Sequence, residues 1–314
     1  MKVISGAGRI KRPFKNTVVA IGIFDGVHRG HQHLISQTVQ RAKEIKGVSV
    51  VLTFFPHPVK VLRPEIKFSY LVSLPHRLRL IESLGVDITV VENFTRRFSR
   101  MTPEVFIRRV LVERLGAVEV FVGDDFRFGQ DRRGDVAVFR QIAQRYAFRL
   151  DVVRPVGANG DSISSTRIRR LIMGGKLTYA ERLLGRRVSV WGTVTRGDRR
   201  GRTLGYPTAN VRFNSDVLPP EGVYLVQAAL KKQTFPALAN IGRCPSFSSP
   251  SQPLKVEVHL LDFKRNIYGQ EILVEFIRKI RNEKTFSRQE DLIRQLKRDE
   301  STARRYFHLF PRPS

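Results

Sequence analysis

The sequence predicts an α/β protein with two domains: a doubly wound parallel sheet, followed by six strands that form a small barrel or sandwich and by a C-terminal helix. The chain of 314 residues is long enough to form two separate hydrophobic cores. Residues 18–156 alternate short β-branched runs with amphipathic helical patterns, which indicates repeated strand–helix–strand units. From about residue 187, strand patterns follow one another without helices between them, which is typical of a small barrel or sandwich.

Several strand patterns of the first domain are apolar on both faces, as in a parallel sheet that is covered by helices on each side. Right-handed crossovers between such strands give a doubly wound sheet, in which ligands bind at the carboxyl ends of the strands. We expect strands at residues 18–24, 48–54, 86–92, 117–123 and 149–156, with helices at 30–45, 75–85 and 103–116.

The second domain has six strand patterns at short spacing and then one helical pattern. Ser287 is followed three residues later by Glu290, a capping box that indicates where this helix begins. The stretch before the first strand is helical rather than rich in glycine and serine, so we expect a stiff junction, with domains at residues 1–184 and 185–314. We expect the strands at residues 187–195, 208–213, 222–230, 234–242, 254–263 and 271–281.

The composition, with 41% hydrophobic and 27% charged residues, is that of a globular protein. Cys244 is the only cysteine, which excludes disulfide frameworks and thiolate metal clusters within one chain. The N-terminus lacks the apolar core of a secretory signal, and no segment approaches the length of a membrane span. We therefore expect a cytoplasmic protein with no membrane partner.

The chain carries 56 Lys and Arg residues against 28 Asp and Glu residues, a formal net charge of +28 that is spread over both domains. Such a charge attracts polyanions, which include nucleic acids and small phosphorylated substrates. The charge alone does not distinguish between the two. Because the sequence contains no known nucleic-acid recognition module, we expect no specific nucleic-acid partner.

Residues 22–35, "GIFDGVHRGHQHLI", read as the end of a strand, a turn and the start of a helix. Gly26 and Gly30 allow a ligand to approach the backbone closely, and the free N–H groups of a helix start favour an anion. His28 and His31 are three residues apart and can point the same way. Together these features predict a phosphate site.

The histidines of this stretch have two other interpretations. A metal site would need a third ligand, for which Asp25 is available, although the HExxH spacing of zinc helices is absent. Packing or surface exposure is the default role for any single histidine, and we keep it for His33.

The stretch resembles the GxFDGxHxGH signature of the nucleotidylyltransferase superfamily, in which the HxGH element binds the phosphates of a nucleotide triphosphate. Three more stretches resemble the bacterial FAD synthetase branch: "TFFPHP" at 53–58, "VGDDFRFG" at 122–129 and "ISSTRIR" at 163–169. The resemblance implies a Rossmann-like fold and attack by the phosphate of FMN on the α-phosphorus of ATP, with release of pyrophosphate. No covalent enzyme intermediate is needed.

The resemblance implies that His28 and His31 are catalytic. It also implies a second phosphate clamp at the helix start near residue 165, whose hydroxyls would otherwise be an ordinary N-cap. Phe54, Phe126 and Phe128 offer flat faces for a flavin ring, or else belong to the core. The substrates are expected beside Gly22, Phe24, Asp25, Gly26, Gly30, His57, Asp125, Phe128, Ser164, Ser165, Thr166 and Arg169.

A glycine-rich segment of the second domain, "GDRRGRT" at 197–203, is one residue short of a phosphate-binding P-loop. It has Arg202 in place of the P-loop lysine, so Gly197, Gly201 and Gly205 would by themselves be turns between strands. The neighbouring "GYPTAN" at 205–210 changes this interpretation.

That motif, together with "PPEGVYLV", "ANIGRCPSF", "VEVHLLDF", "IYG" and "VEFIRKIRNEKTF", resembles the riboflavin kinase domain, a six-stranded barrel. The resemblance implies that Thr208 and Asn210 hold Mg²⁺ and a phosphate of ATP, and neutral oxygen ligands suit this ion when the substrate supplies the charge. The sequence departs from the family at Cys244, interpreted as a small apolar filler, and at Ser246. ATP and flavin are expected beside Gly197, Gly201, Arg202, Gly205, Pro207, Thr208, Asn210, Arg281 and Glu283.

In "LKVEVHLLDF" the alternation of a strand places Glu257 and His259 on the face opposite the apolar residues. A polar residue on an outer face is ordinarily just solvated. The resemblance instead implies that Glu257 is the general base that takes the proton from the 5′-hydroxyl of riboflavin as this attacks the γ-phosphate.

The two domains in this order resemble the bifunctional bacterial riboflavin kinase/FAD synthetases. The resemblance implies that riboflavin is converted to FMN and then to FAD with two ATP and Mg²⁺, and that the partners are the substrates ATP, riboflavin and FMN. We expect a monomer or a weak homo-oligomer. The alternative is a nucleotidylyltransferase for another small phosphate, with a kinase-like domain that binds flavin but is inactive.

Overall fold

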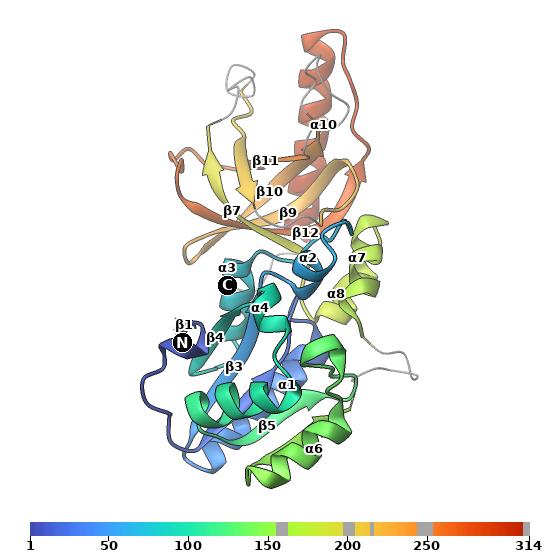
Figure 1. Ribbon diagram of the computed structural model, residues 1–314. Helices are drawn as coiled ribbons and strands as arrows, with labels where there is room; N and C mark the ends of the chain where they lie inside the picture. The colour runs from blue at the N-terminus through green and yellow to red at the C-terminus, as the bar shows by residue number, and fades with distance from the viewer. Residues whose placement is uncertain (155–162, 197–204, 214–216, 244–253, 310–314) are drawn as a thin grey trace. The chain divides into compact units, whose positions relative to one another are not determined.

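The computed structural model describes residues 1–154, 163–196, 205–213, 217–243 and 254–309 (Figure 1). The chain forms two compact units, of which the first comprises residues 1–70 and 74–165 and the second comprises residues 71–73 and 166–314. Helix α8 (Leu177–Leu184) and all of helix α7 (Ser165–Met173) except Ser165 belong to the second unit.

The first unit contains one sheet of six parallel strands in the order β1-β4-β3-β2-β5-β6. This confirms the doubly wound parallel sheet. The chain passes from β2 toward one edge and returns beside β2 with β5, so the strand order reverses at the carboxyl end of β2, where such folds bind ligands. The strands are β1 (Lys2–Ser5), β2 (Thr17–Ile21), β3 (Val48–Phe55), β4 (Ile88–Asn93), β5 (Ala117–Gly123) and β6 (Arg149–Val153).

Successive residues of the central strand β2 pack into different cores. Val18 and Ala20 join the apolar face of α1, whereas Val19 and Ile21 join the core on the opposite face of the sheet. This two-sided burial explains the continuous apolar runs of the sequence. The α-helices of this unit are α1 (Arg29–Glu44), α2 (Pro58–Leu62), α3 (Leu74–Glu82), α4 (Arg96–Ser99), α5 (Pro103–Phe106) and α6 (Val136–Arg145).

Two elements of the first unit differ from the expectation. The strand β1 pairs with β4 at the edge of the sheet, and its four residues are mostly exposed, so it lacks the apolar pattern that marks the other strands. The helix expected at 103–116 begins as α5 and continues as a π-helix over Ile107–Leu115, which the 3.6-residue periodicity does not distinguish.

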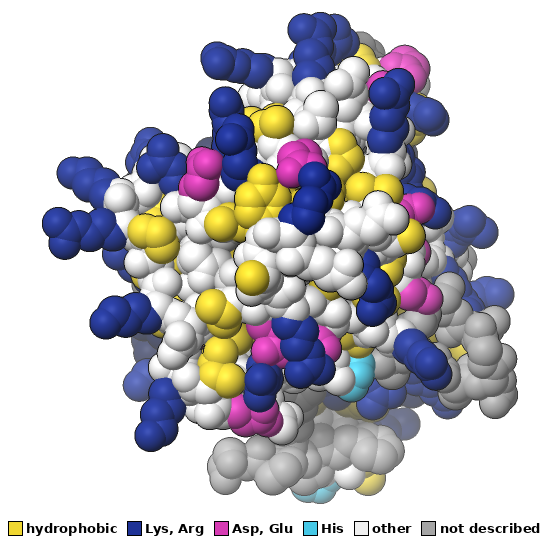
Figure 2. Space-filling model, turned by 60° about the horizontal axis from the view of Figure 1, so that its bottom comes forward, with side chains coloured by type: hydrophobic (Ala, Val, Ile, Leu, Met, Phe, Trp, Pro, Cys, Tyr) yellow, Lys and Arg dark blue, Asp and Glu magenta, His cyan; other side chains and the backbone are white. Residues whose placement is uncertain are grey.

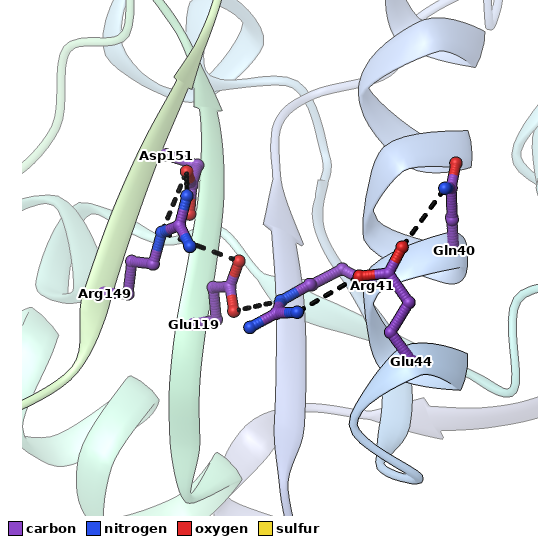
Figure 3. Close-up of polar contacts among 6 residues, drawn as sticks. All are labelled: Gln40, Arg41, Glu44, Glu119, Arg149 and Asp151. Carbon is purple, nitrogen blue, oxygen red and sulfur yellow. Dashed lines mark hydrogen bonds and ion pairs between the residues drawn. The ribbon is translucent and has the colours of Figure 1, made fainter.

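A buried carboxylate ties α1 to the sheet (Figure 3). Glu119 of β5 is 4% exposed, accepts a hydrogen bond from Arg41 Nε at 2.7 Å and lies 3.9 Å from Arg149 Nε. Arg149 also donates to Asp151 at 2.8 Å, and Arg41 donates to Glu44 at 3.1 Å. The network joins α1, β5 and β6 near the amino end of β5, away from the edge where the carboxyl ends of the strands lie.

The second unit is a closed barrel in the order β10-β11-β8-β7-β12-β9, in which neighbouring strands are antiparallel. This confirms the six-stranded barrel. The helix α10 (Gln289–Leu309) begins one residue later than a capping box at Ser287 requires. It packs through Ala303 on the outer surface of the barrel, over Val223 and Leu238. The strands are β7 (Ser189–Thr195), β8 (Ala209–Phe213), β9 (Gly222–Leu230), β10 (Gln233–Gly242), β11 (Lys255–Leu260) and β12 (Glu271–Arg281).

We predict that Glu119→Ala destabilises the first unit, because it leaves Arg41 without its buried acceptor and opens a space under α1. The melting temperature followed by circular dichroism should fall by about 5 °C. Glu44→Ala removes the exposed partner of the same arginine and should change the melting temperature little. Equal effects of the two substitutions would show that the buried carboxylate has no special role.

Candidate functional site

A turn with left-handed backbone joins β2 to α1. Phe24, Gly26 and Val27 have φ angles of +53°, +82° and +40°. Such a conformation costs about 1–3 kcal/mol for a residue that carries a Cβ, and it is rare for a β-branched valine. Phe24 is 1% exposed, and its ring fills the space beside Gly22, where an added Cβ would lie 2.8 Å from the ring. Packing, rather than local preference, therefore fixes this turn.

The carbonyl of Ile23, at the entry to the turn, is held by two side chains. Thr53 Oγ1 donates to this oxygen at 3.0 Å, and Arg77 Nη1 donates to it at 2.6 Å. Arg77 Nη2 also donates to the carbonyl oxygen of Phe54 at 3.4 Å. Because Thr53 lies on β3 and Arg77 on α3, two neighbouring elements fix the peptide group from which the turn starts.

The later carbonyls of the turn are also engaged. Val27 N donates to Phe24 O at 3.2 Å, and Gln32 Nε2 donates to Val27 O at 2.8 Å. Ser165 Oγ, at the start of α7, donates to Asp25 O at 2.9 Å. These oxygens accept internal hydrogen bonds and so are not available to a ligand, whereas the start of a helix favours an anion.

Two imidazoles lie together at the start of α1. His28 is the N-cap, and its Nδ1 accepts a hydrogen bond from the backbone N–H of His31 at 3.4 Å. Their rings are stacked with centroids 3.5 Å apart and planes inclined by 19°. At Gly30 a Cβ would lie 3.4 Å from the His28 ring, so glycine leaves this ring unobstructed. His33 is exposed and takes no part in the stack.

Burial lowers the pKa of His31 well below its usual value of 6.5, and the charges of His28 and Arg77 lower it further. The Nδ1 atom of His31 is inaccessible to solvent and has no hydrogen-bond partner among the described residues. The nearby negative charge belongs to Asp25, which is 2% exposed and acts on Arg77. At neutral pH His31 is therefore an uncharged imidazole, which can donate a hydrogen bond without being a cation.

The carboxyl end of β3 carries an aromatic cluster. His57 is the N-cap of α2, where its Nδ1 accepts a hydrogen bond from Val59 N at 3.1 Å. Its backbone N–H donates to the hydroxyl of Tyr70 at 2.8 Å, and its ring stacks on Phe68 with centroids 4.0 Å apart. Phe55, in the same cluster, is 37% exposed. The predicted His57 thus orders a partly accessible aromatic surface.

At the carboxyl end of β5, Asp124 and Asp125 are exposed, directly after the strand. Phe54 and Phe128 are 7% and 8% exposed and belong to the hydrophobic core, where Phe128 contacts several other phenylalanine rings. Phe126 is half-buried and stacks on Phe128. Of the three phenylalanines that the sequence offered as flavin contacts, only Phe126 therefore has a partly accessible ring.

The hydroxyl-rich stretch at residue 165 falls at the division between the units. Ser164 is exposed, and Ser165 is the first residue of α7 and is tied to the turn through Asp25. Thr166, which is exposed, and Arg169, which is half-buried, belong to the second unit. The structure therefore brings Ser165 to the turn of the first unit.

Four polar residues form a row across the outer face of the barrel in the second unit. Thr195 of β7 lies opposite Asn210 of β8, Asn210 opposite Glu257 of β11, and Glu257 opposite Asn240 of β10. Directly opposed residues of antiparallel strands place their side chains on the same face. The burial pattern of β11 alternates strictly and leaves Glu257 on the outer face, as the sequence predicted. The row places a carboxylate between two amides.

The predicted ATP segment lies beside this row. Gly205 has a φ of +82°, which glycine adopts without strain, and Thr208 directly precedes β8. The carbonyl oxygen of Pro207 is 2.9 Å from His259 Nδ1, and the rings of Tyr206 and His259 are in contact, with centroids 5.4 Å apart. His259, which lies two residues after Glu257 on β11, therefore holds this segment against the barrel.

The two residues expected at the flavin have different surroundings. Arg281 forms a bidentate ion pair with Asp299 of α10, at 2.9 and 2.7 Å, in which the side chains are 16% and 5% exposed. This pair fastens α10 to β12 and leaves little of the guanidinium for a ligand. Glu283 is exposed and accepts a hydrogen bond from Asn240 Nδ2 at 3.3 Å, so it extends the polar row.

Some predicted residues lie outside the described part of the chain, namely Gly197, Gly201, Arg202, Cys244 and Ser246. Among the described residues, no group of three or more His, Cys, Asp and Glu side chains is arranged to hold a metal ion. A groove of about 530 Å³ beside α10 includes none of the predicted site residues, and its Arg304 is already paired with Asp262 and Glu300.

Sequence reasoning missed several residues that shape the two sites. Arg77 lies in a segment that reads only as an amphipathic helix, so its burial has no local signal. Phe68 and Tyr70 lie in a loop. Asn240 lies in "ANIGRCPSF", a stretch that resembles the riboflavin kinase domain. Its position opposite Glu257 depends on the pairing of two strands, which the stretch alone does not reveal.

Known proteins match nearly the whole chain. The family model described as FAD synthetase matches residues 10–167, and the model described as riboflavin kinase matches residues 184–307. A bifunctional riboflavin kinase/FMN adenylyltransferase of Escherichia coli (strain K12) is 38% identical over 311 residues, covering 98% of this chain and 99% of the relative. The protein of the same name from Listeria monocytogenes is 41% identical over 296 residues, covering 93% of each chain.

A crystal structure described as a macrolide-efflux protein from Streptococcus pneumoniae has a TM-score of 0.82 and 31% identity, and it covers 96% of this chain and 98% of that one. The two proteins therefore share their fold. In the part of this chain that the structure describes, no helix has the length and hydrophobicity needed to cross a membrane.

The uncharged imidazole of His31 predicts a pH dependence of stability. The unfolded chain protonates His31 near pH 6.5, whereas the folded chain resists protonation until a lower pH, so the unfolded state binds more protons below pH 6.5. The free energy of unfolding should therefore decrease as the pH falls from 6.5 toward 5.5. Urea unfolding of the wild type and of His31→Gln measures this effect, and an equal pH dependence in both proteins would contradict the assignment.

Proposed function

The chain belongs to the family of bifunctional riboflavin kinase/FMN adenylyltransferases, and we propose that its two reactions take place in separate units. The chain phosphorylates riboflavin with ATP to give FMN and ADP, and it adenylylates FMN with a second ATP to give FAD and pyrophosphate. One observation supports the assignment of one reaction to each unit. The two family matches, residues 10–167 and 184–307, correspond closely to the two compact units.

In the proposed adenylyl transfer, a phosphate oxygen of FMN attacks the α-phosphorus of ATP and pyrophosphate leaves. Three features support the first unit as the place of this step: the fixed turn after β2, the N–H groups at the start of α1, and the stacked His28 and His31. Such donors stabilise negative charge that develops on the α-phosphate and on the leaving pyrophosphate. No nucleophilic side chain is required, since FMN supplies the attacking oxygen.

In the proposed kinase step, Glu257 accepts the proton of the 5′-hydroxyl of riboflavin as the hydroxyl oxygen attacks the γ-phosphorus of ATP, and ADP leaves. The position of Glu257 supports this role, because the register of the barrel strands places its carboxylate on a rigid sheet, beside Asn210 and Asn240. A carboxylate placed in this way contributes about 10²- to 10⁴-fold to the rate.

Thr208 and Asn210 would hold Mg²⁺ in the second unit. Their hydroxyl and amide oxygens fit this hard ion, because the phosphates of ATP supply the negative charge that the two side chains lack. When bound, Mg²⁺ neutralises charge on the phosphates. The contact of His259 with Pro207 supports the proposal, because it fixes the segment that carries Thr208.

The proposed partners are small molecules: ATP, riboflavin and FMN. Figure 2 shows Lys and Arg side chains scattered over the face in view, with Asp and Glu between them, rather than the continuous basic stripe of a duplex-binding surface. The positive field then serves to attract phosphorylated substrates. We further propose a cytoplasmic monomer or weak homo-oligomer, because the cytoplasm provides the ATP that both steps consume.

We predict that Glu257→Gln lowers the rate of FMN formation from riboflavin by at least about 10²-fold, because the variant cannot accept the proton. FAD formation from supplied FMN should stay within about twofold of the wild type. Chromatography of the flavin products separates the two activities. Glu271→Gln is the matched control, since Glu271 is an exposed carboxylate elsewhere on the barrel, and this variant should retain both activities.

The double variant His28→Ala/His31→Ala should show the opposite pattern, with adenylylation of FMN reduced by at least about 10²-fold and phosphorylation of riboflavin retained. His33→Ala, an exposed position on the same helix, is its control and should retain both activities. If either catalytic variant lost both activities equally while remaining folded, the proposed division between the units would be wrong.

A further inference from the structure

Arg77 is a buried cation at the carboxyl edge of the sheet. Its side chain is among the largest fully buried ones, with 1% of the residue exposed. Its guanidinium donates to two backbone carbonyls, of Ile23 and Phe54, and its buried Nε has no hydrogen-bond partner among the described residues. Burial lowers the pKa of Arg77, and the nearby charge of Asp25 opposes that shift. Burying a guanidinium on neutral acceptors is unfavourable for stability, which favours a role in function.

The two carbonyls that Arg77 holds lie where the central strands end. Ile23 follows β2, and Phe54 is the penultimate residue of β3. These strands are neighbours in the sheet, and their carboxyl ends border the turn that leads to His28. Arg77 therefore connects the two strand ends at the edge where a doubly wound sheet binds its ligand.

The Ile23 carbonyl belongs to the peptide group that precedes Phe24, the first left-handed residue of the turn. A strained backbone persists only where its surroundings over-determine it. The short hydrogen bond from Arg77, at 2.6 Å, restrains this peptide group together with the bond from Thr53. Without these bonds the turn could relax toward ordinary φ angles, which would move the N–H groups that follow it.

We propose that Arg77 is a positioning residue for adenylyl transfer: it clamps the Ile23 carbonyl and so holds the turn and the imidazoles of His28 and His31 in their phosphate-binding arrangement. This inference rests on the proposed function of the first unit. Arg77 acts through the turn and through His31, and it need not touch the substrate.

The charge of Arg77 has a second effect on the same site. The groups that act on His31 are the stacked ring of His28, the ring of Phe24 and the guanidinium of Arg77, with Asp25 as the nearby negative charge. Burial is the main cause of the lowered pKa of His31, and Arg77 adds to it. Removing the positive charge should raise that pKa, so His31 would become protonated at a higher pH than in the wild type.

Three variants of the full-length chain separate the effect of the hydrogen bonds that Arg77 donates from the effect of its positive charge. Arg77→Met removes both the hydrogen bonds and the charge. Arg77→Lys keeps the charge, but a single ammonium cannot reach both carbonyls with the geometry of a guanidinium. Thr53→Val is nearly isosteric and removes only the other hydrogen bond to Ile23. For each variant, kcat and KM for adenylylation of FMN are measured as a function of pH, with phosphorylation of riboflavin as the internal reference.

We expect Arg77→Met to lower kcat/KM for adenylylation by about 10²-fold, since displacement of a positioning group by about 1 Å has an effect of this size. The acidic limb of its pH profile for adenylylation should move to higher pH. Arg77→Lys and Thr53→Val should lower kcat/KM by smaller factors and leave the acidic limb in place. Phosphorylation of riboflavin should be unchanged in all three.

The inference is overturned if Arg77→Met melts at a lower temperature but its folded fraction has the kcat/KM and pH profile of the wild type, because Arg77 would then only stabilise the fold. If Arg77→Met does not fold, the test rests on Arg77→Lys. An unchanged kcat/KM for adenylylation in that variant overturns the inference. A wild-type chain that makes FMN but no FAD would instead refute the proposed function of the first unit.

Discussion

The left-handed turn between β2 and α1 is the constraint on which the first unit depends. Its conformation is unfavourable for Phe24 and Val27, so the rest of the unit must impose it. The neighbouring strand, α3 and the start of α7 each contribute a donor to one of its carbonyls, and the buried ring of Phe24 fills the space beside Gly22. A turn fixed in this way holds the start of α1 in place in advance, so ATP, in the proposed adenylyl transfer, would not have to order it on binding.

The second unit holds its polar groups in fixed positions with a regular sheet. Its polar row needs no strained backbone, because the register of three antiparallel strands already places Asn210, Glu257 and Asn240 side by side. The row runs over the outside of the barrel and ends at Val223, where the apolar cluster under α10 begins. The ion pair between Arg281 and Asp299 fastens α10 at that border. A closed barrel thus provides a rigid surface that orients Glu257, the proposed general base.

The fold was predictable to the extent that the relevant signals are local. Periodicity located five of the six parallel strands and all six strands of the barrel, whereas β1 is too short and too exposed to show a pattern. The motif around His28 and the alternation at Glu257 were likewise visible in the sequence. The burial of Arg77, the core position of Phe128 and the pairing of Arg281 with Asp299 depend on residues far away in the chain, so no local pattern could reveal them.

We propose that one chain carries two sites that use ATP in chemically different ways. The most direct measurement follows radioactive phosphorus from ATP into the flavin products formed from riboflavin. Label from the γ-phosphate should appear in both FMN and FAD, because FMN is formed first and retains that phosphate. Label from the α-phosphate should appear in FAD alone, because only the second step transfers AMP. Label from the α-phosphate in FMN, or the absence of labelled FAD, would contradict the account.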